Sequence, residues 1–259
     1  MLSLPILLSL TAFAAPADVG DALQRQAATS SHPFPKLSEN DQRKLDAGEI
    51  VKLRLADAAG AAVGALGLVI TDVGRNDLWM GSMDVHTKPP SDIDLHPLQP
   101  LGGELYRWYG FVDLPEPFDD RHFLIRTTID SRLSQKSNGS VWERSWALEG
   151  DWPQTARAMA DQGLFAGVDA HNFDAAVPTP VNQGAWTVVN LADGRSLVAY
   201  QVATALGGDI PDGLLNRYLY WTLEGVLKNV VASARGMSAH YVAGHEPLIG
   251  GDGKPIATY

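Results

Sequence analysis

The sequence contains no cysteine, so catalytic thiolates, zinc–thiolate sites and disulfide bonds are all excluded. It also has few basic residues: 20 Lys and Arg stand against 30 Asp and Glu, which gives a formal net charge of −10 over 259 residues. No basic cluster interrupts this acidic background. Nucleic acid and anionic membranes are therefore not expected as main partners.

Motifs for catalysis and for metal or cofactor binding are absent as well. The seven histidines include His240 and His245, but none falls at the spacing of a helical HExxH or a comparable ligand set. The segment GMSAH around Ser238 lacks the GxSxG pattern of a hydrolase serine. The glycine-rich segments ALGLV and LGG lack the residues that bind phosphates or dinucleotides. The sequence therefore predicts no catalytic residue, no metal and no cofactor.

What the chain does contain is an ordinary composition, 45% hydrophobic and 19% charged, and a hydrophobic N-terminus. Residues 1–14 carry no charged side chain, are rich in Leu and Ile, and end in Ala12-Phe13-Ala14. This is the form of a secretory signal peptide, although the usual Lys or Arg is missing, and it is too short to span a bilayer as a mature helix. We predict cleavage after Ala14 and export to the periplasm or the extracellular space. A buried N-terminal helix is the alternative, which Pro5 and Pro16 disfavour.

Turn and capping signals divide the rest of the chain into segments. Residues 15–37 are small, polar and proline-bearing and predict a flexible leader, whereas the glycine-rich residues 237–259 predict a loose tail. A short helix is expected from Ser38, its N-cap. A second short helix within 71–85 would place Leu78, Trp79 and Met83 on one face. A helical insertion is expected over residues 151–176.

The remaining segments alternate in polarity as strands do. Asn138-Gly139 and the segment from Ala192 to Arg195 are hairpin signals, so neighbouring strands are expected to be antiparallel. The strand-like segments are 50–56, 58–70, 93–98, 104–114, 122–129, 140–148, 185–191 and 196–204.

The last predicted element is a long helix over residues 211–235. Pro211 suits its first turn and Gly236 suits the position after its end. At 1.5 Å per residue it would be about 37 Å long, enough to lie across a whole sheet. The pattern predicts an α+β domain in which one helix packs on an antiparallel sheet. Its apolar face recurs every three or four residues: Leu215, Leu219, Leu223, Val226, Val230 and Ala234.

Two stretches resemble a known family. The aromatic LYRWYGF followed by DLPEPFDDRHF, and later GAWTVVNLADGRSLVAYQVATALGGDIPDGLLNRYLYWTLEGVLKNV, resemble START-like members of the SRPBCC superfamily. The likeness covers roughly residues 40–236, and it implies a START-like domain over residues 38–236. The implied fold is a helix grip, in which a curved antiparallel sheet wraps around the long C-terminal helix. The implied ligand is one lipid-like molecule, such as a sterol, fatty acid, phospholipid or polyketide, in a hydrophobic cavity between them.

The DLPEPFDDRHF corner permits two interpretations. Asp119, Asp120, Arg121 and His122 could form an acid–base cluster. Alternatively, the prolines fix a strand exit and Asp120 pairs with Arg121 across the turn, since the corner is structural in the family it resembles. We favour the structural interpretation, in which Arg121→Ala lowers stability and His122→Ala changes little.

The candidate binding residues follow from the resemblance and from the aromatic content. Any one tryptophan is more typical of an ordinary core, but together they are compatible with an aromatic cavity wall. The family can place a charge inside the cavity, and Arg126, Glu143 and Arg144 lie within strands. Period-2 alternation does not decide which strand face lines the cavity. The predicted ligand-binding residues are Trp79, Met83, Trp108, Tyr109, Arg126, Trp142, Trp146, Trp186, Tyr200, Leu215, Tyr218 and Leu219.

Three functions are compatible with these features. The first is an exported, monomeric module that binds or transfers a lipid, sterol or fatty acid without catalysis, with transient membrane contact during transfer. The second is an aromatase/cyclase-type enzyme on the same fold, which the export signal opposes because such substrates are made on cytosolic carrier proteins. The third is an interaction domain whose own side chains fill the cavity.

Overall fold

The computed structural model describes residues 19–55, 63–84, 93–98, 105–114, 116–165, 168, 170–208, 210 and 212–259. The predicted signal peptide, residues 1–14, lies outside this range. The helices are α1 (Val19–Thr29), α2 (Glu39–Asp46), α3 (Arg75–Met83), α4 (Ser131–Lys136), α5 (Trp152–Asp161), α6 (Ala170–Ala175), α7 (Asp212–Ala234) and α8 (Met237–His240). The strands are β1 (Val51–Leu55), β2 (Val63–Thr71), β3 (Ile93–Pro97), β4 (Leu105–Val112), β5 (Arg121–Ile129), β6 (Val141–Leu148), β7 (Val177–Pro178), β8 (Val181–Asn190) and β9 (Ser196–Ala205).

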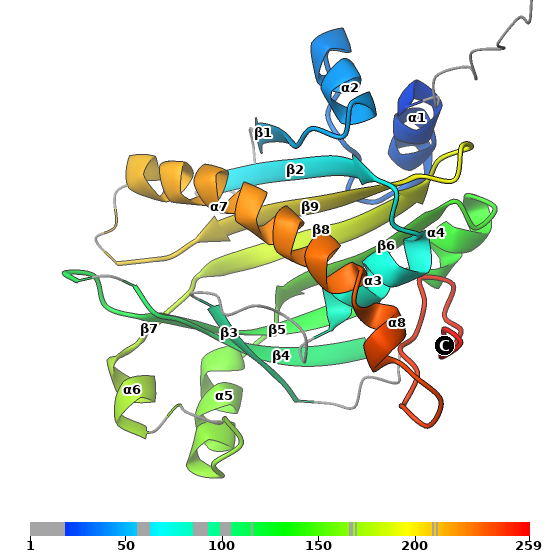
Figure 1. The fold of residues 1–259 in the computed structure, drawn as a ribbon. Coiled ribbons are helices and arrows are strands. Elements are labelled where there is room, and N and C mark those ends of the chain that lie inside the picture. The colour runs from blue at the N-terminus through cyan, green and yellow to red at the C-terminus, as the bar shows by residue number, and fades with distance from the viewer. Residues whose placement is uncertain are drawn as a thin grey trace, which may run out of the picture.

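These strands form one sheet in the order β1-β2-β9-β8-β6-β5-β4-β3, with every neighbouring pair antiparallel. The short β7 lies off this path and pairs with β5 in parallel. The sheet curves, and α7 runs obliquely across it (Figure 1). The α+β class and the helix-grip arrangement are therefore confirmed. None of the helices within the described ranges is long and apolar enough to cross a membrane.

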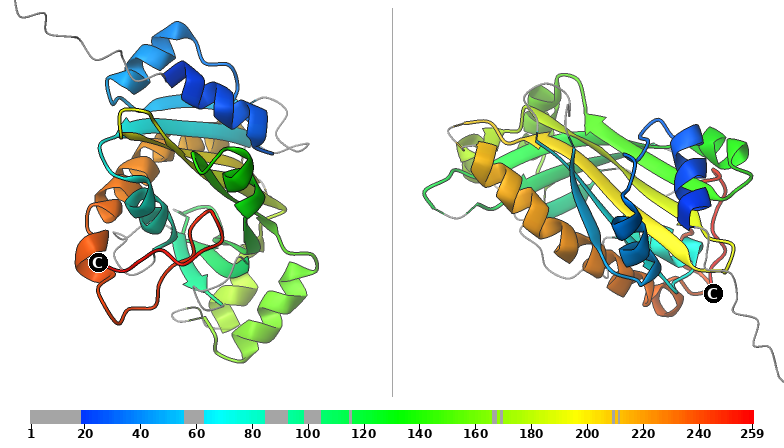
Figure 2. Two further views of the ribbon diagram at one scale, coloured as in Figure 1. Left: turned by 90° about the vertical axis from the view of Figure 1, so that its right-hand side faces the viewer. Right: turned by 90° about the horizontal axis from the view of Figure 1, so that it is seen from above.

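Side-chain alternation gives the sheet two faces that carry different layers. The inner face, which faces α7 and α3, includes Trp108, Ile125 and Val202. The outer face carries two separate helix pairs (Figure 2). The pair α1 and α2 packs on residues such as Leu68, while α5 and α6, which form the predicted insertion, pack on Leu124. Adjacent residues of one strand thus belong to different cores.

The C-terminal half of α7 is packed closely because two glycines face it. A Cβ atom on Gly67 of β2 would lie 2.9 Å from Leu227 Cδ1, and one on Gly81 of α3 would lie 2.8 Å from the backbone nitrogen of Ala234. The predicted apolar face is confirmed here, since Leu223 and Val230 are buried. This half of α7 is therefore packed closely against β2 and α3.

Two turn predictions have different outcomes. The second predicted hairpin is confirmed: Leu191 N donates to Arg195 O at 2.9 Å, and Gly194 takes the positive φ of 88° that the turn requires. The first is confirmed as a turn between antiparallel strands, since β5 pairs with β6 and Asn138 and Gly139 take positive φ angles of 52° and 77°, but the connection is longer than the turn alone. Helix α4 lies between β5 and β6, because the Asp130 carboxylate accepts a bond from Leu133 N and starts a helical turn.

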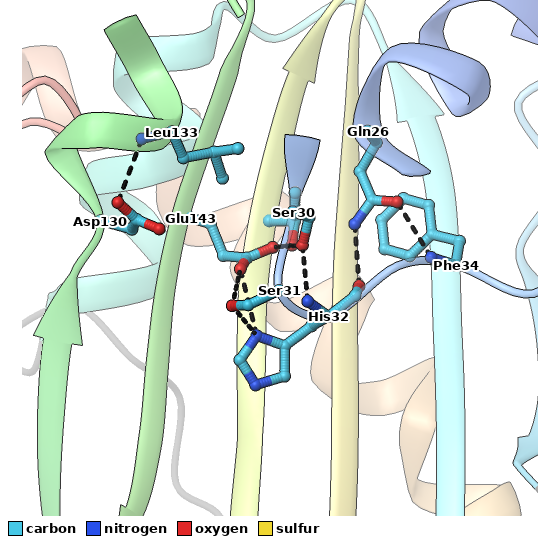
Figure 3. A network of polar contacts seen from close by, with 9 residues as sticks. Gln26, Ser30, Ser31, His32, Phe34, Asp130, Leu133 and Glu143 are labelled. Atoms are coloured by element: carbon cyan, nitrogen blue, oxygen red, sulfur yellow. Dashed lines mark hydrogen bonds and ion pairs between the residues drawn. The ribbon is translucent and has the colours of Figure 1, made fainter. Parts of the chain in front are cut away.

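The expectation of a flexible leader is wrong for residues 19–37. Helix α1 buries Val19 and Ala22 against the outer face, and Phe34 lies in the same core. The Gln26 side chain fixes the following loop, since its amide donates to His32 O and its oxygen accepts from Phe34 N, both at 2.9 Å (Figure 3). The order of this segment depends on its contacts with the sheet, which composition alone does not reveal.

The expectation of a loose tail is also wrong. Residues 237–259 return to the core, where Tyr241, Leu248 and Ile256 are buried. The indole Nε1 of Trp79 donates to Ile249 O at 2.8 Å, and Gly251 fits directly beneath the ring of Trp142. The glycines of this tail therefore permit close packing and do not indicate flexibility.

Candidate functional site

A cavity of about 250 Å³ lies between the inner face of the sheet and α7, which lines it from Leu215 to Val230. Its walls come from β4, β5, β6, β8 and β9 on one side and from α7 on the other. Most of the lining is apolar or aromatic, as in most small-molecule sites. The lining residues are Ser82, Leu95, Trp108, Val112, Phe123, Ile125, Thr127, Arg144, Trp146, Asn182, Trp186, Tyr200, Val202, Thr204, Leu206, Leu215, Tyr218, Leu219, Val226, Asn229 and Val230.

Three aromatic rings form one wall of the cavity. Tyr200 lies between Trp186 and Trp146, with ring centroids 4.6 Å and 5.4 Å away. Trp146 rests over Gly184, where a Cβ would come within 2.4 Å of its ring, and its indole Nε1 donates to Asn182 Oδ1 at 2.9 Å. Close packing and this hydrogen bond fix the wall in place before any ligand binds.

Among the described residues, one charged side chain lines the cavity. Arg144 of β6 is buried, donates to Ser82 O, and its Nε has no hydrogen-bond partner. Burial lowers the pKa of Arg144 to about 10, and nearby Tyr106 and Tyr200 oppose this shift. The guanidinium therefore stays positive at neutral pH. Burial also raises the pKa of Tyr200 to about 12, so this phenol stays neutral.

A larger groove, of about 670 Å³, lies on the outer face of the sheet between His32 and Glu149. Its floor includes the polar side chains of Arg126, Gln183 and Gln201. The groove mixes these polar groups with apolar residues such as Pro33 and Leu148, whereas the inner cavity is lined mostly by apolar and aromatic side chains. The smaller inner cavity is therefore the better candidate for a hydrophobic ligand.

Comparison with known proteins gives similarity in structure only. No protein-family model matches the chain, and no curated protein matches it. The STAR-related lipid transfer protein fragment from Xanthomonas axonopodis is similar with a TM-score of 0.52 at 19% identity, covering 78% of this chain and 97% of that one. Human StAR-related lipid transfer protein 5 gives 0.51 at 10% identity, covering 84% and 93%. This chain has the START fold.

A third similar structure is the Zhui aromatase/cyclase from a Streptomyces species, with a TM-score of 0.37 at 13% identity, covering 73% of this chain and 95% of that one. This structural similarity is too low to support a conclusion about chemistry. The START fold thus agrees with the family resemblance seen in the sequence. A fold alone does not determine an activity, so the function depends on the residues of the cavity.

The START fold brings seven of the twelve predicted site residues to the cavity. These residues come from four strands and from α7, and they are Trp108, Trp146, Trp186, Tyr200, Leu215, Tyr218 and Leu219. Sequence reasoning missed Phe123, Ile125 and Thr127 of β5, which share the inner face with Trp108 because Trp108 pairs with Ile125. Only the register reveals this, so no local signal in the sequence could have found them.

Five predicted site residues lie elsewhere, and these predictions are corrected. Trp79 and Trp142 meet edge to face with centroids 5.5 Å apart, and they belong with Met83 to the core near the end of α7. Tyr109 lies on the outer face under α5 and α6, where its ring stacks on Phe165 at 3.8 Å. All four are buried side chains that support the fold without lining the cavity.

Arg126 is the fifth correction. It lies on the outer face of β5, half-exposed, and forms an ion pair with Glu149 at 3.5 Å. It faces away from α7 because Ile125 and Thr127, its neighbours on either side, face inward. The inward arginine is Arg144 of β6.

The DLPEPFDDRHF corner has a structural geometry. The buried guanidinium of Arg121 donates to the carbonyl oxygens of Leu206, Gly207 and Asp119, and thereby joins this corner to the loop between β9 and α7. Arg121 also donates to the backbone oxygen of Asp120 at 3.2 Å, but the Asp120 carboxylate forms no ion pair with it and instead accepts from Leu114 N at 3.1 Å. The corner therefore holds a loop in place at the end of the sheet.

His122 lies away from the cavity, in the core under α5 and α6. Its Nδ1 is 3.1 Å from the Tyr109 hydroxyl, and its ring contacts Phe173 and Trp152 at centroid distances of 4.6 and 5.2 Å. Burial lowers the pKa of His122 from 6.5 to about 4. The expectation that His122→Ala changes little is therefore replaced by an expected loss of stability.

This lowered pKa predicts a pH dependence of stability. The unfolded chain binds a proton at His122 as the pH falls through about 6.5, whereas the folded protein does so only near 4. The contribution of the neutral ring is therefore complete above pH 6.5 and decreases from there toward pH 4. We expect His122→Phe to reduce the drop in urea midpoint between about pH 7 and pH 5. If the drop in urea midpoint of His122→Phe equals that of the wild type and of a control variant at the exposed His171, this prediction is contradicted.

Proposed function

We propose that this protein binds one hydrophobic molecule in the cavity between the sheet and α7 and does not alter it chemically. The observation that carries the proposal is the apolar cavity of about 250 Å³ with a rigid aromatic wall. A lipid is supported as the ligand class because the two START-fold structures with higher TM-scores are named lipid transfer proteins.

The cavity volume limits the size of the bound part. Small-molecule pockets typically enclose about 300–1,000 Å³, so a cavity of about 250 Å³ is at the small end of this range. A medium-length carbon chain suits this volume. A whole sterol would require α7 to move outward.

The lining also supports binding without catalysis. None of the described residues around the cavity is His, Asp or Glu, the groups that most often move protons near neutral pH. The phenol of Tyr200 has its pKa raised to about 12, which makes it a poor proton donor or acceptor. These features disfavour the cyclase-type enzyme, and the open volume disfavours a cavity filled by its own side chains.

Titration with neutral hydrophobic ligands tests the proposal, with tryptophan fluorescence as the signal because Trp108, Trp146 and Trp186 line the cavity. At about 0.8 kcal/mol per buried methylene, a ten-carbon chain gains roughly 8 kcal/mol before association costs. We expect decanol to saturate the signal below about 100 μM, with little salt dependence because the contact is not ionic. A panel of alcohols, fatty acids and sterols without a saturable response would contradict the proposal.

We also propose that the protein is exported and that its mature chain begins at Ala15. The support is the small-x-small sequence at Ala12 and Ala14, and the cleavage would leave helix α1 intact because α1 begins at Val19. Intact-mass analysis of the protein recovered from outside the cytoplasm should show a chain shortened by residues 1–14. Recovery of the full-length chain in the cytosol alone would exclude export.

A further inference from the structure

The guanidinium of Arg144 is the one cation that lines the cavity among the described residues, and the protein leaves it largely uncompensated. Arg144 donates one hydrogen bond to Ser82 O, but its Nε has no hydrogen-bond partner. None of the ion pairs within the described ranges includes Arg144. A buried charge without an anionic partner is destabilising, so an anionic partner for Arg144 is expected to come from outside the chain.

Among the other arginines, Arg121 and Arg107 are satisfied, and the two whose Nε also lacks a hydrogen-bond partner, Arg25 and Arg75, do not line the cavity. Arg121 donates to backbone carbonyl oxygens at the corner, and Arg107 pairs with Glu149. The acid next to Arg144 in the sequence is not available to it, since adjacent strand residues face opposite sides of the sheet. Figure 3 shows the Glu143 carboxylate on the outer side, where it accepts from Ser30 and contacts His32 Nδ1 at 3.1 Å.

The second unpartnered polar atom in the cavity lining is also a donor. The indole Nε1 of Trp108 is buried without a hydrogen-bond partner. A guanidinium and an indole N–H can both donate, but neither can accept. The missing group is therefore an acceptor, and beside a cation an anionic acceptor gives the stronger hydrogen bonds.

We infer that the natural ligand is a medium-chain carboxylic acid whose carboxylate pairs with Arg144 while its carbon chain fills the apolar part of the cavity. This inference rests on the proposed function and names its ligand class. A neutral alcohol leaves the charge of Arg144 uncompensated, and an amine is repelled by it. A single arginine suits a carboxylate, whose two oxygens match the guanidinium fork.

The test compares decanoate, decanol and decylamine, which share one tail, by calorimetric titration at neutral pH. The proteins are the wild type, Arg144→Gln, and Arg126→Gln as a matched control on the outer face. We expect the wild type to bind decanoate at least tenfold more tightly than decanol and to bind decylamine most weakly. Arg144→Gln should remove this preference and keep decanol binding, whereas Arg126→Gln should behave as the wild type.

The outcomes separate the two proposals. If the wild type binds decanol and decanoate equally, the carboxylate inference is overturned and the hydrophobic-ligand proposal stands. If none of the three ligands binds, the carboxylate inference is overturned, and the proposed function fails as well when the panel of alcohols, fatty acids and sterols gives no saturable response. Should Arg144→Gln prove unfolded by circular dichroism, the acid-to-alcohol ratio of the wild type still decides the inference, because it requires no variant.

Discussion

Replacing Arg121 by alanine should lower the free energy of unfolding by about 3 kcal/mol or more. The side chain is 2% exposed and donates to the carbonyl oxygens of Leu206 and Gly207 across the loop before α7. Alanine would leave these acceptors without a donor in a buried place, and would free a loop that adjoins the cavity. Chemical denaturation at neutral pH, with the midpoint and slope both recorded, measures the loss.

Arg126 offers the matched control for this substitution. It lies on the same strand, but it is half-exposed and its ion pair with Glu149 is open to solvent on one side. Such pairs contribute between zero and about 1 kcal/mol, so Arg126→Ala should be nearly neutral. Equal losses for the two variants would show that the corner does not depend on the Arg121 contacts.

Replacing Arg144 by methionine should have the opposite sign and raise the stability of the ligand-free protein by about 1–3 kcal/mol. Methionine keeps much of the volume of the arginine stem and removes a buried charge that the protein does not pair. Denaturation of delipidated protein, with and without decanoate, should show a more stable variant that decanoate no longer stabilises selectively.

A loss of stability on Arg144→Met, comparable to that of Arg121→Ala, would contradict this account. It would mean that the bond from Arg144 to Ser82 O supports α3 more than the unpaired charge weakens the fold. Arg121 and Arg144 thus illustrate two roles of a buried arginine. Arg121 is satisfied by backbone carbonyl oxygens, whereas we propose that Arg144 binds a ligand.

The order of elements could be predicted from the sequence because its signals are local. The expected helix over 211–235 is α7, Asp212–Ala234, and the expected helix around Trp79 is α3. The apolar repeat of α7 and the turn at Gly194 each depend on residues only a few positions apart. Such patterns remain readable without knowledge of the tertiary fold.

The side of the sheet that lines the cavity could not be predicted in this way. Alternation along β5 puts Arg126 on one face and Ile125 on the other, but it does not say which face meets α7. The pairing of Trp108 with Ile125 decides it, and that register joins residues 17 positions apart. The choice of Arg126 over Arg144 failed for this reason.

The packed termini could not be predicted for a related reason. The segment from Ser30 to His32 is held by Glu143, more than 110 positions away, and the tail near Ile249 is held by Trp79. Glycine, serine and proline in these segments are typical of mobile chain, and only their distant partners order them. Likewise, aromatic content cannot separate a core tryptophan such as Trp142 from a cavity tryptophan such as Trp186.

Two adjacent residues of β9 allow the most direct measurement of where the ligand binds. Val202 lines the cavity on the inner face, and Ala203 lies on the outer face. We expect Val202→Trp to fill the cavity and weaken decanoate binding at least tenfold, while Ala203→Trp leaves the affinity unchanged in a protein of similar melting temperature. Equal affinities in both variants would contradict the claim that the cavity between the sheet and α7 is the binding site.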